Sequence, residues 1–138
     1  MVKYKFLEHT ADVKFQASGK SLEEAFKAAA FALREVITKN PKIKINNTIK
    51  KNIKVKGKDN EALLYNFLEE FLFLLDAKDF LLSKINKIKI KDNKLEAEII
   101  GDKASNYKFS NDVKAVTYNE MYVKKDKNKY ICQVVLDV

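Results

Sequence analysis

Hydrophobic and polar residues alternate at the start of the chain. Tyr4 and Phe6 alternate with Lys3 and Lys5, and an apolar residue then recurs at every second position from Val13 to Ala17. A two-residue period of this kind predicts strands with one buried face. The segment 8–12 between them is polar and contributes little to packing. The sequence therefore predicts two strands joined by a polar connection.

The next segment has the helical period instead. Its apolar residues recur three and four positions apart, which predicts an amphipathic helix over residues 21–38. Ser21 is a good N-cap, and Glu24 three residues later completes the pattern of a capping box. Asn40 and Pro41 are expected to end this helix.

A second helix is predicted over residues 60–75, with Asp59 as its N-cap. Its apolar face is wide, so we expect it to pack against neighbours on more than one side. Before it, apolar residues at odd positions from Ile43 to Val55 predict one broken strand or two short ones.

Four further strands are predicted after the second helix. Turn residues separate them at 92–93 and 126–128, and the mostly polar stretch 102–112 is expected to be an exposed loop. The last strand, 130–138, is apolar on both faces, which is typical of a central strand covered on both sides. The predicted fold is α+β, with two helices packed on antiparallel or mixed sheets in the order ββ-α-β(β)-α-ββββ.

Length and composition favour one soluble domain spanning residues 1–138. The chain has 138 residues, of which 46% are hydrophobic, and contains no apolar run long enough to cross a bilayer. Its first residues alternate instead of forming a signal peptide, so a cytoplasmic location is expected, without membrane contact. Cys132 is the only cysteine, and its apolar surroundings predict a buried structural thiol.

The chain is basic, with a formal net charge of +8. This charge would allow weak, salt-sensitive contact with phosphates such as those of tRNA. Arg34 is the only arginine, however, and lysines are less suited than arginines to forming bidentate hydrogen bonds with bases or phosphates. A solvated lysine-rich surface is the preferred interpretation.

The end of the chain offers the first candidate for chemistry. Asp137 would place its carboxylate beside the α-carboxylate of Val138, and two like charges so close repel each other unless a cation joins them. If Asp12 also approached, three hard oxygen groups would gather, which suits calcium or magnesium. From spacing alone, an exposed chain end with both charges in water is the favoured alternative.

Other features give weaker signals. His9 is the only histidine and has no partner at zinc-ligand spacing, so a structural role is preferred. The stretch 114–118 reads by default as a half-buried strand with one solvated lysine. No phosphate-binding glycine loop and no nucleophile motif are found, which argues against autonomous nucleotide hydrolysis.

Several ungapped segments together resemble the archease family. They occur in the family's order and extend over nearly the whole chain: Phe6–Val13, Gly19–Phe26, Leu63–Glu70, Val113–Tyr118 and Leu136–Val138. The third of these segments resembles the family's second helix, which ends near Asp76. Each segment alone would be a weak signal, and their combination is specific.

The resemblance implies a function that spacing could not predict. Archeases act with the RtcB-type RNA ligase of tRNA splicing, promoting its guanylylation and multiple turnover and widening its nucleotide choice. In the family a divalent cation, assigned as calcium, is held by positions that correspond here to Asp12, Asp137 and Val138. Five further residues of the motifs are candidates for supporting these ligands or contacting the partner: His9, Thr10, Lys114, Thr117 and Tyr118.

One position departs from the family pattern, since Asn119 stands where the family usually has histidine. Any proton-transfer or metal-binding role of that histidine is therefore not expected here. The leading hypothesis is a non-enzymatic activator of the ligase. The alternatives are a basic RNA-binding or chaperone-like module, which would lack an aromatic stacking platform, and a phosphoryl-transfer enzyme, which would lack a general base.

Overall fold

The computed structural model describes residues 3–8, 12–39 and 49–138 of the chain. This part contains seven strands and two helices in the predicted order. One sheet has the strand order β1-β2-β7-β6 and the other β3-β5-β4, and every strand pair is antiparallel. The elements are β1 (Lys3–Leu7), β2 (Val13–Gly19), α1 (Leu22–Ile37), β3 (Ile49–Lys56), α2 (Asn60–Lys78), β4 (Phe80–Lys91), β5 (Lys94–Lys103), β6 (Ala115–Asp126) and β7 (Lys129–Asp137). The α+β prediction is confirmed.

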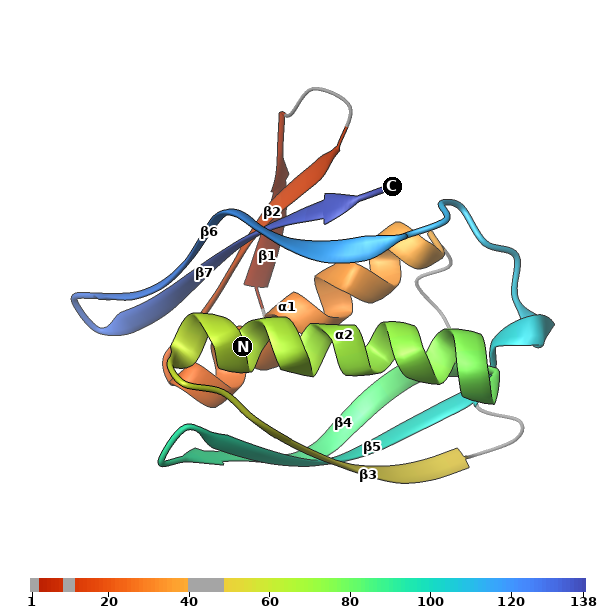
Figure 1. Ribbon diagram of the computed structural model, residues 1–138, viewed down its shortest axis with the longest axis horizontal. Helices are drawn as coiled ribbons and strands as arrows, with labels where there is room; N and C mark the ends of the chain where they lie inside the picture. The colour runs from red at the N-terminus through yellow and green to blue at the C-terminus, as the bar shows by residue number, and fades with distance from the viewer. Residues whose placement is uncertain (1–2, 9–11, 40–48) are drawn as a thin grey trace.

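The two helices lie between the two sheets, so the domain has three layers (Figure 1). Helix α1 packs mainly on β2 and β4, and α2 packs on β6, β3 and β4. The wide apolar face predicted for α2 is explained by this position, because α2 meets both sheets at once. Neither helix in the described ranges is apolar enough along its length to cross a membrane.

Helix α1 begins as the sequence predicts. The side chain of Ser21 accepts a hydrogen bond from the backbone N–H of Glu24 at 3.1 Å. The carboxylate of Glu24 reaches back to the N–H of Lys20 at 2.7 Å, one residue before the usual position of a capping box. The helix ends at Ile37, and the stop signals predicted at Asn40 and Pro41 lie outside the described residues.

Helix α2 is capped by Asp59, whose carboxylate accepts the N–H of Ala62 at 2.7 Å. It runs three residues further than predicted and ends where Asp79 takes a left-handed conformation with φ of 52°. The next strand, β4, begins immediately at Phe80. Ile43 and Ile45 of the pattern that predicts one broken strand or two short ones lie outside the described residues, and β3 accounts for the rest of that pattern.

The expectation of an exposed loop over residues 102–112 is wrong at its beginning. Asp102 and Lys103 belong to β5, and Asp102 is only 2% exposed. The burial is tolerated because the carboxylate accepts hydrogen bonds from the hydroxyl of Tyr107 at 2.7 Å and from the N–H of Lys103 at 2.7 Å. The polar composition of this segment predicts exposure to solvent, whereas the carboxylate of Asp102 is buried and accepts its hydrogen bonds from the protein.

Strand β7 is central, as predicted, and lies between β2 and β6. The residues from Cys132 to Leu136 are all buried. Helices cover only one face of β7, because both helices lie on the same side of this sheet (Figure 1). Burial, and secondarily the charge of Glu61, raises the pKa of the Cys132 thiol to about 12, which agrees with a structural cysteine.

Candidate functional site

One corner of the β1-β2-β7-β6 sheet brings together the motifs from both ends of the chain. Val13 of β2 pairs with Leu136 of β7, so Asp12 and Asp137 come next to each other where this pair of strands ends. On the other side of β7, Asp137 pairs with Ala115 of β6. The corner is thus formed by the start of β2, the end of β7 and the start of β6.

The corner is held by backbone pairing next to a buried strand. The N–H of Lys114 donates a hydrogen bond to the carbonyl oxygen of Asp137 at 2.8 Å. Leu136, one residue earlier, is fully buried, whereas Asp12, Asp137 and Val138 are partly exposed. The buried strand β7 therefore fixes the position of its partly exposed end, Asp137 and Val138, at the surface.

The predicted candidates are distributed around this corner to different degrees. Lys114 lies beside Asp137, and its side chain is exposed. Thr117 is tied to β7, since its hydroxyl donates to the carbonyl of Val135 at 2.9 Å. His9 and Thr10 lie outside the described residues. The described ranges contain no group of three or more His, Cys, Asp or Glu side chains that could hold a metal. The described part of the corner has two such side chains, Asp12 and Asp137.

Beyond Thr117 the edge strand β6 leaves the regular ladder. Thr117 pairs with Val135 and Tyr122 with Gln133, so the segment 118–121 stands opposite the single residue Val134. Glu120 within it has a left-handed conformation with φ of 54°. Its carbonyl accepts a hydrogen bond from the side chain of Gln133 at 2.9 Å, and its carboxylate forms an ion pair with Lys14 at 3.1 Å. The bulge is therefore fixed by β2 and β7.

The bulge carries one ring of an aromatic pair, and the other ring comes from α2. The rings of Tyr118 and Tyr65 are stacked with centroids 4.3 Å apart, and Tyr118 is 55% exposed. Desolvation of the Tyr118 hydroxyl raises its pKa, and Tyr65 and Asp59 add to this effect. Asn119, the position that departs from the family pattern, is exposed in the same bulge.

Sequence reasoning missed how α2 supports β6. Two adjacent glutamates on a helix, Glu69 and Glu70, predict a solvated strip, yet the Glu69 carboxylate accepts a hydrogen bond from the backbone N–H of Val116 at 3.0 Å. Glu61 accepts the N–H of Val123 at 2.9 Å in the same way. Glu61, Tyr65 and Glu69 are spaced four residues apart and so share one helix stripe. That spacing was the available signal, but only the tertiary structure shows that β6 covers the stripe.

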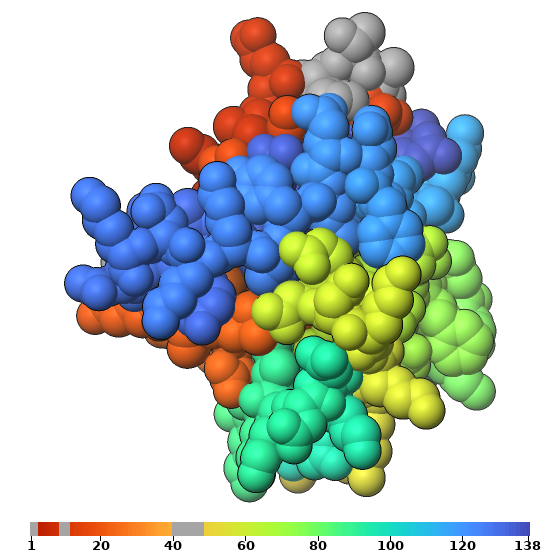
Figure 2. Space-filling view, turned by 60° about the vertical axis from the view of Figure 1, so that its left-hand side comes forward, coloured from red at the N-terminus to blue at the C-terminus, as the bar shows by residue number. Residues whose placement is uncertain are grey.

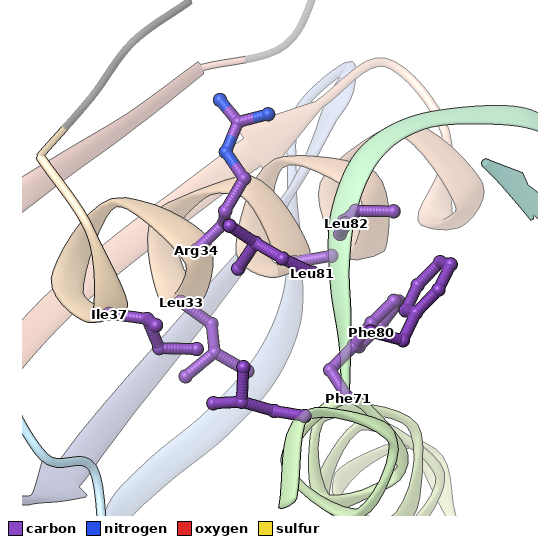
Figure 3. Close-up of a pocket in the computed structure, with 9 residues that line it drawn as sticks. Leu33, Arg34, Ile37, Phe71, Phe80, Leu81 and Leu82 are labelled. Carbon is purple, nitrogen blue, oxygen red and sulfur yellow. The ribbon is translucent and has the colours of Figure 1, made fainter. Parts of the chain in front are cut away.

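A pocket between α1, α2 and β4 is lined mainly by apolar side chains, with Leu33, Phe71 and Phe80 among them (Figure 3). Arg34 lies at its margin and donates to the carbonyl of Ser83 at 3.1 Å. Within the described residues its Nε atom has no hydrogen-bond partner. This arrangement is a packing gap beside a partly buried arginine, and it contains no pair of acid, base or nucleophile.

The geometry defines a class of protein: an α+β domain that encloses two helices between antiparallel sheets and gathers its opening and closing motifs at one sheet corner. The model of the Archease protein family (MTH1598/TM1083) matches residues 4–138. The chain belongs to this family.

Individual relatives agree with this assignment. Protein archease of Pyrococcus abyssi is 38% identical, with 100% of each chain covered. Protein archease of Methanosarcina barkeri is 35% identical over 98% of this chain and 95% of the relative. The solution structure of Methanobacterium thermoautotrophicum protein 1598 is 32% identical, with a TM-score of 0.76 over 98% of each chain.

A crystal structure from Thermotoga maritima, described as an archease and possible chaperone, is 24% identical, with a TM-score of 0.69 over 97% of this chain and 96% of that one. At that identity it supports the fold alone.

Proposed function

We propose that this protein is a non-enzymatic accessory factor that activates an RtcB-type RNA ligase of tRNA splicing. It would promote guanylylation of the ligase and multiple turnover, and widen the nucleotides that the ligase accepts. The observation that carries the proposal is membership of the archease family over residues 4–138, together with the register that joins the family's opening and closing motifs at one corner.

The surface chemistry of this corner supports a contact role. Tyr118 is a large, half-exposed aromatic ring that is held in place by Tyr65, and rigid aromatic side chains are frequent anchors of protein interfaces. The same sheet corner carries charge of both signs, from the exposed Lys114 and from the partly exposed Asp12 and Asp137. In the described residues the corner has no histidine or buried cysteine that could act as a base or nucleophile.

We further propose that Asp12, Asp137 and Val138 hold a divalent cation, with calcium preferred and magnesium second. The donor set fits a hard ion, because it consists of carboxylate and main-chain oxygens. Calcium accepts more ligands and a less regular arrangement than magnesium, which suits a half-exposed corner completed by water. When bound, the ion would neutralise the acidic pair and join the start of β2 to the end of β7.

In this proposal the residues of the chain have separate roles. Asp12 and Asp137 would bind the ion, whereas the backbone of Lys114 orients the carbonyl of Asp137. Thr117 keeps β6 in register before the bulge, and Tyr118 would contact the ligase near its nucleotide-loading site. His9 and Thr10 would support the ligands or contact the partner.

The test is a ligase assay with purified components. The protein alone, incubated with GTP and RNA whose ends bear a 3′-phosphate and a 5′-hydroxyl, is expected to give no joined product. The ligase alone should stop after about one turnover, and adding the protein should raise both the guanylylated fraction and the number of turnovers. Asp12→Ala and Asp137→Ala should abolish this stimulation.

A matched control removes an aspartate from the far end of the same sheet. Asp126→Ala changes an exposed side chain at the tip of the β6–β7 hairpin and should leave stimulation intact. Turnover by the isolated protein that survives repurification would overturn the proposal. Equal ligase turnover with and without the protein would overturn it as well.

A further inference from the structure

The outward face of the β3-β5-β4 sheet is strongly basic. The helices cover only the inner face of this sheet, so the other face has no helix layer over it (Figure 1). Ten charged side chains of the strands point outward and are exposed or partly exposed, and they are termed the lysine face: Lys50, Lys54, Lys56, Lys84, Lys87, Lys89, Lys91, Lys94, Glu96 and Glu98. Figure 2 shows the tip of the β4–β5 hairpin, at the end of this face, projecting from the body.

Strand register collects these residues on one face. Lys56, Lys94 and Lys91 form one cross-strand row, and Lys54, Glu96 and Lys89 form the next. Neighbouring strands lie about 4.8 Å apart and successive rows about 7 Å apart, so the ammonium groups form a two-dimensional array.

A bulge at Asn86 is essential to this arrangement. The outward residues of β4 are even-numbered at Lys84 and odd-numbered from Lys87 onward. The pairing passes from Ile85 opposite Ile99 to Lys87 opposite Glu98, which leaves Asn86 as an extra residue. Without this residue the three later lysines would turn toward the helices, because a shift of one position exchanges the two faces of a strand.

Most of the chain's excess charge lies here. The chain has 27 basic and 19 acidic residues, and the lysine face holds eight of the former and two of the latter. The face therefore carries +6, and the remaining 19 basic and 17 acidic residues contribute only +2. Glu98 pairs with Lys50 at 3.2 Å and Glu96 with Lys54 at 3.7 Å. Across the described residues, the other six lysines of the face have no ion pair.

The chemistry of the face selects among polyanions. None of its residues is aromatic, and the large exposed hydrophobic side chains of the described residues, such as Phe73 and Tyr118, lie on other elements. A protein interface would need apolar anchors at its centre, and single-stranded RNA would need rings on which bases can stack. Base-paired RNA presents two rows of phosphates and keeps its bases stacked, so lysines alone can bind it.

We propose that the lysine face binds the phosphate backbone of base-paired RNA without reading its sequence. This face lies across the helix layer from the acidic corner of Asp12 and Asp137 (Figure 1). One molecule could therefore hold a folded RNA on one side and contact a protein partner on the other. The proposal does not depend on ligase activation, since it concerns binding by the isolated chain.

The competing explanation is that the lysines only protect the sheet. Strands β3 and β4 are both edges, and lysines on edge strands discourage pairing with other chains. That role would require charge at the edges of the sheet. It would give no preference for duplex RNA, and RNA binding would not depend on the lysines of this face more than on those of another. The two explanations differ in a measurable way.

The experiment measures binding of the full chain to a fluorescent RNA hairpin of about 20 base pairs by anisotropy, at salt concentrations from about 50 to 200 mM. The test variant replaces Lys54, Lys56, Lys89 and Lys91 by Gln. The matched control replaces four exposed lysines of the β6–β7 hairpin by Gln and so removes the same charge from the other sheet: Lys124, Lys125, Lys127 and Lys129.

Wild type is expected to bind with a steep salt dependence. The test variant should bind at least about tenfold more weakly at low salt and lose about 3.6 units of the log–log salt slope, because each of its four lost phosphate contacts contributes about 0.9. The control variant should change affinity by less than about threefold. Glu96→Gln removes a negative charge from the face and should tighten binding, which gives a readout that misfolding cannot imitate.

Several results would overturn the proposal. Equal weakening by the two quadruple variants would show that only net charge matters. Absence of binding by wild type at low salt would reject an RNA site. Tighter binding of a single-stranded RNA of equal length would reject the duplex, and tighter binding of polyglutamate of equal charge would indicate an acidic protein partner instead.

Discussion

The rings of Tyr65 and Tyr118 are stacked in parallel, with centroids 4.3 Å apart and planes inclined by only 7°. One ring comes from α2 and the other from the bulge of β6, so the contact joins a helix of the middle layer to an edge strand. Tyr118 remains 55% exposed despite this contact. A ring that is both exposed and immobilised is suited to contact a partner.

Tyr118→Ala is therefore expected to impair ligase stimulation much more than stability. Loss of the aromatic pair should lower the free energy of unfolding by about 1 kcal/mol, measured by urea denaturation. Tyr118→Phe preserves the stack and should retain the stability of wild type. Stimulation unchanged in Tyr118→Ala would remove this ring from the contact surface.

Replacing Glu69 by Ala should destabilise the domain by about 1–3 kcal/mol, because the backbone N–H of the buried Val116 would lose its acceptor. Glu70→Ala, the neighbouring substitution, is the control and should stay within about 0.5 kcal/mol of wild type. Glu69→Gln keeps an acceptor oxygen and should fall between them. Equal stability of Glu69→Ala and Glu70→Ala would argue that the hydrogen bond contributes nothing.

The buried pair Asp102 and Tyr107 predicts a specific dependence on pH. The hydrogen bond from the Tyr107 hydroxyl is the main cause that holds the pKa of Asp102 below its ordinary value. A group with a lowered folded pKa stabilises the protein above its unfolded pKa, near 4 for aspartate, and this contribution disappears as pH falls further. Tyr107→Phe should thus be less stable than wild type near neutral pH, with the difference shrinking below about pH 4.

The same pair can be followed from the alkaline side. Burial, followed by the hydrogen bond to Asp102, raises the pKa of Tyr107 to about 12. Its contribution to stability is present below the ordinary tyrosine pKa of about 10 and is lost between there and about 12. Tyr130→Phe is the control for both experiments, because Tyr130 is partly buried and no carboxylate of the described residues is hydrogen-bonded to it. A pH profile of Tyr107→Phe parallel to that of wild type would contradict the prediction.

The cation site is tested most directly by calorimetric titration with calcium and with magnesium. Wild type should bind one ion, and Asp12→Ala with Asp137→Ala together should abolish binding while leaving the fold intact. Saturating the site at about 100 times its Kd should raise the free energy of unfolding by about 2.7 kcal/mol. Equal binding by wild type and the double variant would exclude this site, and Asp126→Ala is expected to bind as wild type does.

Much of the fold could be predicted from local patterns. Helix α1 and helix α2 were located within a few residues, because each combines a helical apolar period with a capping side chain, Ser21 or Asp59. The hairpin turn at Asp92 and Asn93 was predicted correctly, and both residues have positive φ. Periodicity and turn chemistry act over a few residues, so a sequence read alone contains them.

The residues of the candidate site were predicted mainly from the resemblance to a family and not from local patterns. What the sequence determined by itself was the chemistry of each residue, including the acidic character of Asp12 and Asp137. Their proximity depends on the pairing of Val13 with Leu136, which lie more than a hundred positions apart in the chain. No local pattern encodes such a register.

Only the tertiary structure decided which polar groups serve the fold and which face solvent. By sequence Glu69 is expected to be a surface charge, but in the structure it accepts a hydrogen bond from the N–H of Val116 in β6. By sequence Asp102 is expected in an exposed loop, but its carboxylate accepts a hydrogen bond from the hydroxyl of Tyr107. The lysines of β4 share one face because of the extra residue at Asn86. Hydrogen bonds and cross-strand rows join residues distant in sequence, so their partners are fixed by how the layers pack and not by local spacing.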